Sequence, residues 1–276
     1  MESIQRLPAV AGQFYTDNPT QLRQQILSFL PQSVKPTALA VISPHAGYMY
    51  SGRVAGYSFK ALAEADTYIL LGPVHQMAKA HFGMSLKDWS TPLGTARIDA
   101  GLAKTLEQKT QIVCDETAHL REHSLEVQLP FLQVTNPKMK FVPVAVHPTS
   151  TFKEDAAELG SAIGGIIKSS KKSIGIVTSS DFSHFIPEGE AKEVDLGAID
   201  LITRLDADGF LDYVESNNAS ICGYAPITVM LHALKTIGIK KGELLKYDTS
   251  ASVTHDTSNV VGYASVKFDK RKNGPV

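Results

Sequence analysis

The feature that most constrains this fold is an alternation of short apolar segments with longer segments of helical periodicity. The apolar segments are rich in β-branched residues, which predicts strands at Leu39–Ser43, Tyr68–Gly72, Phe141–Val146, Ser173–Ser179, Leu244–Thr249 and Val260–Phe268. The periodic segments predict helices at Pro19–Leu30, Ser51–Ala63, Gly101–Glu107, Ser124–Val134, Lys153–Ile167, Glu188–Leu205, Ala207–Ser216 and Pro226–Ile237. Such alternation is typical of βαβ units, so we predict a three-layer α/β/α sandwich around a mainly parallel or mixed sheet.

Length and composition favour one domain. The 276 residues suffice for a large core, and the chain shows no repeat, low-complexity segment or linker that would divide it. We therefore predict a single domain over residues 1–276.

Charge and hydropathy argue against several classes of partner. The net charge of −1 gives no electrostatic footprint for nucleic acid. No apolar stretch approaches the roughly 20 residues that span a bilayer, and Gln5, Arg6 and Pro8 interrupt any secretory pattern. The two cysteines, Cys114 and Cys222, lie far apart and do not resemble a disulfide framework. We expect a cytoplasmic protein with reduced thiols and no nucleic-acid or membrane partner.

Polar side chains follow three of the predicted strands. His45 follows Leu39–Ser43, His75 follows Tyr68–Gly72, and Asp181 with His184 follows Ser173–Ser179. Ligands of open α/β sheets bind outside the carboxyl ends of the strands. A single loop histidine is more often an ordinary hydrogen-bonding residue, but three independent motifs predict a metal or acid/base site at one sheet edge.

Asp181 and His184 share one short polar loop. The carboxylate could orient the imidazole, and His184 could then act as a general base. The alternative is a turn in which Asp181 caps a helix and His184 is exposed.

Cys222 precedes Gly223 and a helix that starts near Pro226. A thiol close to a helix N-terminus is more readily ionised, and the thiolate binds metal or attacks substrate. The alternative role is that of a small buried apolar residue, which is the role we expect for Cys114.

Two further histidines are weaker candidates. His123 and Glu126 are three residues apart, so on the predicted helix they would share a face. They could line the site or bind metal, although a hydrogen bond on the helix surface is equally consistent. His81, six residues after His75, is expected on a following strand.

At these residues the sequence resembles the Memo family, which includes prokaryotic proteins called AmmeMemoRadiSam system protein B. The matching segments span most of the chain in order: Ala11-Gly12 with Tyr15, Pro44-His45-Ala46-Gly47-Tyr48, Ser51-Gly52, Gly72-Pro73 with His75, Thr91-Pro92-Leu93, Glu122-His123-Ser124-Leu125-Glu126, Ser180-Asp181-Phe182-Ser183-His184 and Cys222-Gly223 with Pro226. Phe14 departs from the pattern, because the family has tryptophan there.

The resemblance implies a fold similar to class III extradiol dioxygenases, which hold non-haem iron with two histidines and a carboxylate. Carried onto this chain, it implies His45, His75 and Cys222 as metal ligands. Asp181, His184 and His123 would then be the catalytic residues. Iron(II) is the expected metal, the thiolate makes copper an alternative, and zinc is the least expected.

Three functions remain open from the sequence. The first is a metal-dependent redox protein or dioxygenase-like enzyme acting on a small molecule. The second is a non-catalytic module that binds a small molecule or a peptide in the same cleft. The third is a zinc hydrolase with His184 as base. The oligomeric state is also left open.

Overall fold

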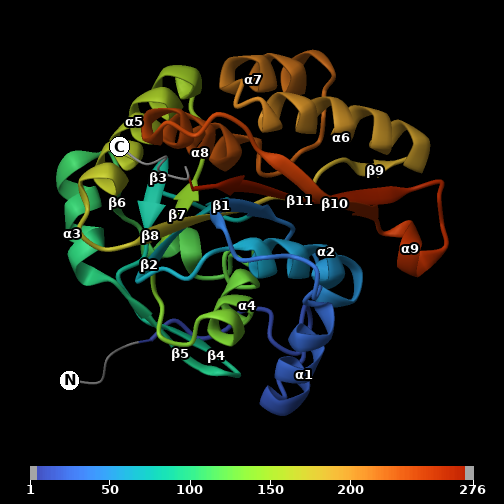
Figure 1. The fold of residues 1–276 in the computed structure, drawn as a ribbon, viewed down its shortest axis with the longest axis horizontal. Coiled ribbons are helices and arrows are strands. Elements are labelled where there is room, and N and C mark those ends of the chain that lie inside the picture. Colours follow the sequence, from blue (N-terminus) through green and yellow to red (C-terminus); the bar gives the residue numbers. More distant parts are fainter. Residues whose placement is uncertain (1–4, 271–276) are drawn as a thin grey trace.

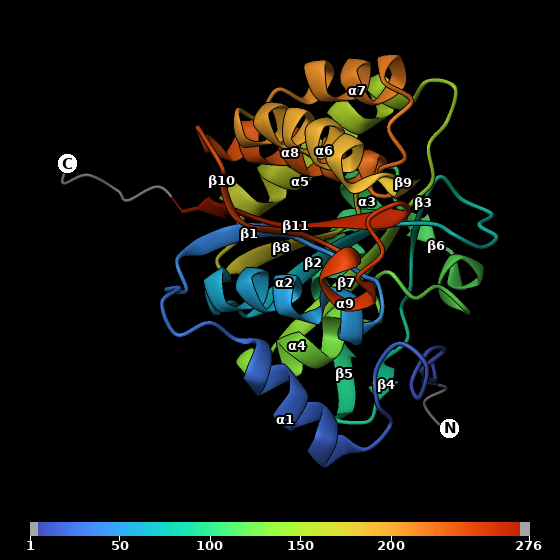
Figure 2. The ribbon, with the colours of Figure 1, turned by 90° about the vertical axis from the view of Figure 1, so that its right-hand side faces the viewer.

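The structure, a computed structural model, describes residues 5–270 as a large mixed sheet covered by helices on both faces (Figures 1 and 2). The helices are α1 (Pro19–Phe29), α2 (Tyr48–Ala61), α3 (Ala100–Lys109), α4 (Gln128–Thr135), α5 (Phe152–Ser169), α6 (Glu188–Thr203), α7 (Ala207–Ser216), α8 (Tyr224–Ile237), α9 (Ala251–Thr254) and a 3-10 turn η1 (Glu116–His119). Figure 2 shows α5, α6, α7 and α8 over one face and α1, α2 and α4 over the other. The predicted three-layer α/β/α architecture is confirmed.

The sheet is parallel at its centre and antiparallel towards its edges. Its strands are β1 (Ala38–Ser43), β2 (Thr67–Pro73), β3 (Phe82–Met84), β4 (Trp89–Thr91), β5 (Gly94–Ile98), β6 (Val113–Cys114), β7 (Lys140–Val146), β8 (Ile174–Ser179), β9 (His184–Ile186), β10 (Glu243–Thr249) and β11 (Val260–Asp269). The main path runs β10-β11-β1-β8-β2-β7-β3-β6, with β1, β8, β2 and β7 mutually parallel. The carboxyl ends of these four strands therefore meet at one edge of the sheet.

Burial explains why these four strands occupy the centre. Every residue of β1, β2 and β8 is buried, and so is every residue of β7 except Lys140. Such continuous apolar runs belong in a sheet that helices cover on both faces. In one helix layer, α5 packs so closely on α8 that a Cβ at Gly160 would collide with the Val229 carbonyl oxygen, so glycine permits this approach.

One predicted helix start is wrong. The segment expected to be helical from Ser124 forms turns until α4 begins at Gln128. Pro130 gives the physical reason: it lacks an N–H and is tolerated only in the first turn of a helix. A helix that began at Ser124 would have placed Pro130 in its interior.

The six strands predicted with bounds are all present. The strand expected after His75 is β3, which begins at Phe82, so His81 directly precedes it. Strands β4, β5, β6 and β9 were not predicted, and α9 was missed as well. Each of these four strands has two to five residues, too few for an alternating pattern to stand out. Strands β3, β4, β5 and β6 extend the sheet beyond β7, and β9 pairs with β11 near the edge where the histidines lie.

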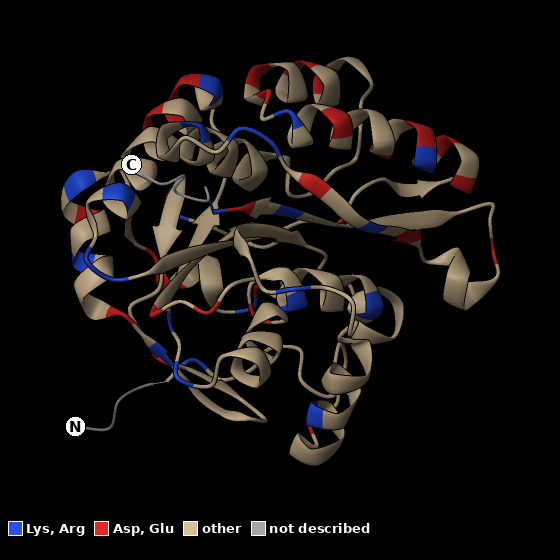
Figure 3. Ribbon diagram, viewed as in Figure 1, with Lys and Arg blue, Asp and Glu red and all other residues tan. Residues whose placement is uncertain are grey.

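No helix within residues 5–270 is long and apolar enough to cross a membrane. Figure 3 shows acidic positions gathered on α6 and α7, whereas basic positions are spread over both helix layers.

Candidate metal centre

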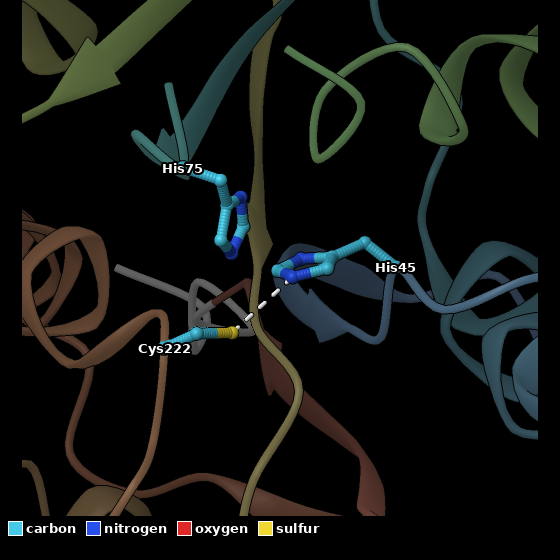
Figure 4. A group of neighbouring side chains, drawn as sticks. All are labelled: His45, His75 and Cys222. Atoms are coloured by element: carbon cyan, nitrogen blue, oxygen red, sulfur yellow. Dashed lines mark hydrogen bonds between the residues drawn. The ribbon is translucent and has the colours of Figure 1, made fainter. Parts of the chain in front are cut away.

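The candidate site lies at the carboxyl ends of the central parallel strands. His45 follows β1, His75 follows β2 and Asp181 follows β8, while Cys222 approaches from the loop before α8. Figure 4 shows the side chains of His45, His75 and Cys222 turned towards one another from these three different segments. Residues far apart in the sequence thus converge where an open α/β sheet binds its ligands.

The ligand atoms are close enough to share one ion. Those of His45, His75 and Cys222 all lie within 4.8 Å of one another, and Cys222 Sγ is 3.2 Å from His45 Nε2. In a tetrahedral site with metal bonds of about 2.0 Å to nitrogen and about 2.3 Å to sulfur, those two atoms lie about 3.5 Å apart. The donor set therefore fits a transition metal without a large rearrangement.

A hydrogen-bond network fixes the tautomer of His45. Ser179 Oγ donates its only hydrogen to the Ser124 carbonyl oxygen at 2.7 Å, so it must accept from both Gln128 Nε2 at 2.9 Å and His45 Nδ1 at 2.8 Å. His45 Nδ1 therefore carries the proton, and Nε2 keeps a lone pair directed towards Cys222. Burial also lowers the pKa of His45, as do the nearby histidines His123 and His75, and this favours the neutral form that binds metal.

Glu122 plays the same role for His75. Its carboxylate accepts from the His75 backbone N–H at 2.6 Å and lies 2.9 Å from Nδ1. Burial works against the charged carboxylate, but hydrogen bonds from His75 and Ser124 outweigh it and lower the pKa of Glu122 to about 2. An ionised Glu122 holds the proton on Nδ1 of His75 and leaves Nε2 free to bind a metal.

His75, Glu122 and His123 form a second compact group, but its chemistry does not suit a metal. Glu122 Oε1 already accepts from His75 Nδ1 and from the backbone N–H groups of His123 and Ser124. Oε2 accepts the backbone N–H of His75. With both oxygens engaged, Glu122 orients a ligand and is poorly placed to be one.

Cys222 is held by the loop after β8. The backbone N–H of Asp181 donates to Sγ at 3.3 Å, and Cys222 lies directly before the start of α8. The expected ease of ionisation is wrong for the protein without metal, because burial and the charge of Asp181 raise the pKa of the thiol well above its usual range. A bound cation would favour the thiolate through its own charge.

The partner of His184 differs from the one expected. His184 Nδ1 lies 2.7 Å from the Ser220 carbonyl oxygen and must donate to it, so Nε2 carries the lone pair. Asp181 instead accepts the backbone N–H of His45 at 2.8 Å, and burial raises the pKa of its carboxyl. The idea that Asp181 orients His184 is therefore wrong.

A cavity of about 470 Å³ opens beside two of the candidate ligands, His45 and His75. Apolar and aromatic side chains surround it, and the candidate acid/base residues Asp181, His123 and His184 reach its wall. Its lining also includes Phe14, His45, Ala46, Gly47, Tyr50, His75, Phe185, Ser250, Thr254, Asn259, Val261 and Tyr263. A small molecule in this cavity would contact both the histidine cluster and an aromatic rim.

His123 and Glu126 do not share a helix face, because both precede α4. His123 lies in the cavity wall and stacks on His75 with 4.6 Å between the ring centroids. Glu126 is fully buried and forms an ion pair with Arg6 at 2.6 Å, so its carboxylate is already engaged and does not serve as a metal ligand. Cys114 was expected to be buried, but it is exposed on β6.

Sequence reasoning missed the residues that orient the ligands: Glu122, Ser179 and Gln128. Glu122 directly precedes His123, and Ser179 ends a strand, but neither position signals a partner. Their partners are His75 and His45, which lie 47 and 134 residues away in sequence. Only the folded sheet brings such residues together.

Comparison with known proteins agrees with this geometry. The sequence profile of the family described as Memo-like protein matches residues 6–267. The chain belongs to the Memo family. A MEMO1 family protein of Methanopyrus kandleri is 40% identical over 96% of this chain and 99% of its own length. Those of Methanosarcina barkeri and Sulfolobus acidocaldarius are each 39% identical over 95% of this chain and cover 98% and 99% of their own lengths.

One solved structure shares the fold of this Memo-family chain. It is the crystal structure of an uncharacterized protein from Escherichia coli K12, with a TM-score of 0.54. The likeness covers 82% of this chain and 98% of the other, but only 14% of the aligned residues are identical. It therefore supports the fold alone.

Proposed function

We propose that this protein is a metalloprotein in which His45, His75 and Cys222 hold one iron(II) ion and support redox chemistry on a small molecule. The observation that carries the proposal is the convergence of three ligand atoms within 4.8 Å, with both imidazoles oriented through Nδ1. Imidazole and thiolate ligands suit iron and copper. When bound, such an ion supplies electron transfer or activation of a bound substrate.

The residues around the ligands have separate roles in this proposal. His184 presents a lone pair on Nε2, so it can take a proton from a molecule in the cavity. Asp181 holds the His45 backbone and the sulfur of Cys222 in place. His123, whose pKa burial lowers, offers a second neutral imidazole at the cavity wall.

Copper is the alternative metal, and it is favoured by one observation, the sulfur ligand. A soft thiolate stabilises copper(I) more than a carboxylate would. A zinc hydrolase and a non-catalytic binding module would use the same residues as the redox protein. Metal content and redox response therefore have to distinguish the three functions.

The test is elemental analysis of protein purified anaerobically without a metal-affinity tag. The wild-type protein should contain about one equivalent of iron or copper, and reductive and oxidative titration should change its optical spectrum. His45→Ala and Cys222→Ala should each lose most of that metal, because each removes one of three ligands. Cys114→Ala is the matched control, since Cys114 is the exposed cysteine of β6 and should keep the metal.

Circular dichroism should report the same helical content in all four proteins. Unchanged metal content in folded Cys222→Ala protein would refute this ligand set. One equivalent of zinc with no redox response would favour the hydrolase. A folded wild-type protein that binds none of the three metals would leave only the binding module.

A further inference from the structure

A second pair of histidines lies outside the candidate centre. Strands β3 and β7 are antiparallel, and their register pairs Phe82 with Val146. One position further, the His147 backbone N–H donates to the His81 carbonyl oxygen at 2.7 Å. His81 and His147 therefore stand opposite each other where this ladder ends, and both side chains are exposed.

The two imidazoles are already arranged side by side. Their ring centroids are 6.2 Å apart and the ring planes differ by 5°. Directly opposite residues of an antiparallel pair project from the same face of the sheet. Two imidazoles that share a tetrahedral ion, with metal–nitrogen bonds of about 2.0 Å, have centroids about 5 Å apart. Exposed side chains can close the remaining 1 Å or so by small rotations.

The loop that follows His147 leads to an acidic residue, Asp155. Asp155 lies in the first turn of α5, and its Oδ2 accepts from the Thr149 hydroxyl at 2.7 Å and the Thr151 hydroxyl at 2.9 Å. These hydrogen bonds lower the pKa of Asp155, and the nearby His81 contributes in the same direction. The carboxylate is therefore ionised at neutral pH, and the charge of His81 acts on it, but the three side chains must draw together before they could share an ion.

We propose that His81, His147 and Asp155 form a second, outer site for a divalent transition metal. Two imidazoles and a carboxylate suit Zn²⁺, Ni²⁺ or Cu²⁺, whereas the inner set contains a thiolate. The outer site lies at the same edge of the sheet as the inner one, because β7 and β2 are parallel neighbours and their carboxyl ends meet there. His75 and His81 also bound the same loop, so one connection carries a ligand of each site.

The test is a calorimetric titration of the wild-type protein with Zn²⁺ at pH 7.5. We expect two binding events, a tighter one at the inner set and a weaker one at the outer set. His147→Gln should lose one equivalent, the weaker event, and keep the tighter event. Cys222→Ala should weaken the tighter event and keep the weaker one, so failure of either site is recognised independently of the other.

The control is His255→Asn, which removes an exposed histidine on another loop. Asparagine tolerates the left-handed backbone of position 255, where φ is 60°. This variant should retain both events. A wild-type titration with only the tighter event would overturn the proposal. So would a weaker event that survives His147→Gln or disappears equally in His255→Asn.

Discussion

Replacing Ser179 with alanine tests whether the orientation of His45 matters as the structure implies. The substitution removes one hydroxyl and nothing else from the end of β8. That hydroxyl accepts from His45 Nδ1 at 2.8 Å and from Gln128 Nε2 at 2.9 Å, and it donates to the Ser124 carbonyl oxygen at 2.7 Å. Gln128 Nε2 can still donate to the carbonyl oxygens of Pro44 and Ser124 after the substitution. His45 Nδ1 is therefore the group that loses its hydrogen-bond partner.

The expected magnitude follows from what His45 can do next. Leaving a buried N–H without a partner costs about 1–3 kcal/mol. The imidazole can relieve this cost by moving its proton to Nε2, but that tautomer has no lone pair for a metal. Loss of a group that orients a metal-binding histidine typically lowers metal affinity about 10- to 100-fold. We therefore expect a loss of about 1.4–2.7 kcal/mol in the free energy of metal binding.

The assay is an anaerobic competition titration against a chromophoric chelator, with urea unfolding of the metal-free proteins in parallel. Thr178→Val is the matched control, because the neighbouring hydroxyl is buried with no hydrogen-bond partner within residues 5–270. This control should bind metal as the wild-type protein does. If folded Ser179→Ala protein bound metal within about twofold of wild type, a difference of about 0.4 kcal/mol, the proposed tautomer control would be wrong.

Two other variants probe stability and the role of His184. Burial lowers the pKa of His119 to about 4, so the unfolded state takes up a proton first as the pH falls. The stability present above pH 6.5 should then decline by about 2 kcal/mol at pH 5. Urea unfolding of His119→Phe should show a smaller decline, and an identical pH profile would contradict this. His184→Ala should retain its metal by elemental analysis, because Nδ1 is engaged by Ser220 and His184 is outside the ligand group. Metal loss as severe as in His45→Ala would instead make His184 a ligand.

The central strands could be predicted because their signal is local. Each of β1, β2 and β8 is a continuous apolar run, and the residue types alone indicate burial on both faces. The polar residues that follow such runs could then be assigned to one edge of the sheet. His45 and His75 were found in this way, without any knowledge of their partners.

The hydrogen bonds that orient these ligands could not be predicted, because they depend on sheet order. Nothing near His45 in the sequence indicates Ser179, but β1 and β8 are adjacent parallel strands and their register pairs Ser43 with Ser179. The partner of His184 was misassigned for a similar reason. Asp181 is nearer in sequence, but the chain turns between the two residues and presents Ser220 to the imidazole.

The N-terminal segment shows how a part of the chain without ligands can still determine the site. Arg6 forms a buried ion pair with Glu126 through Nη1 at 2.6 Å, and Nη2 donates to the Glu122 carbonyl oxygen at 2.6 Å. Arg6 thus holds the backbone of Glu122, the residue whose side chain orients His75. Phe14 of the same segment packs on the cavity wall at His123, with 4.8 Å between the ring centroids.

Breaking a buried ion pair by removing one partner costs about 3–5 kcal/mol. That cost arises because the remaining charge is left buried without a partner, so Arg6 and Glu126 must stay together and thereby constrain the loop that carries Glu122. The three ligands come from loops after β1 and β2 and before α8, and loops alone position side chains poorly. The precision of this site must come from such fixed contacts around it. A search for function that considered only His45, His75 and Cys222 would overlook the residues that make them a usable set.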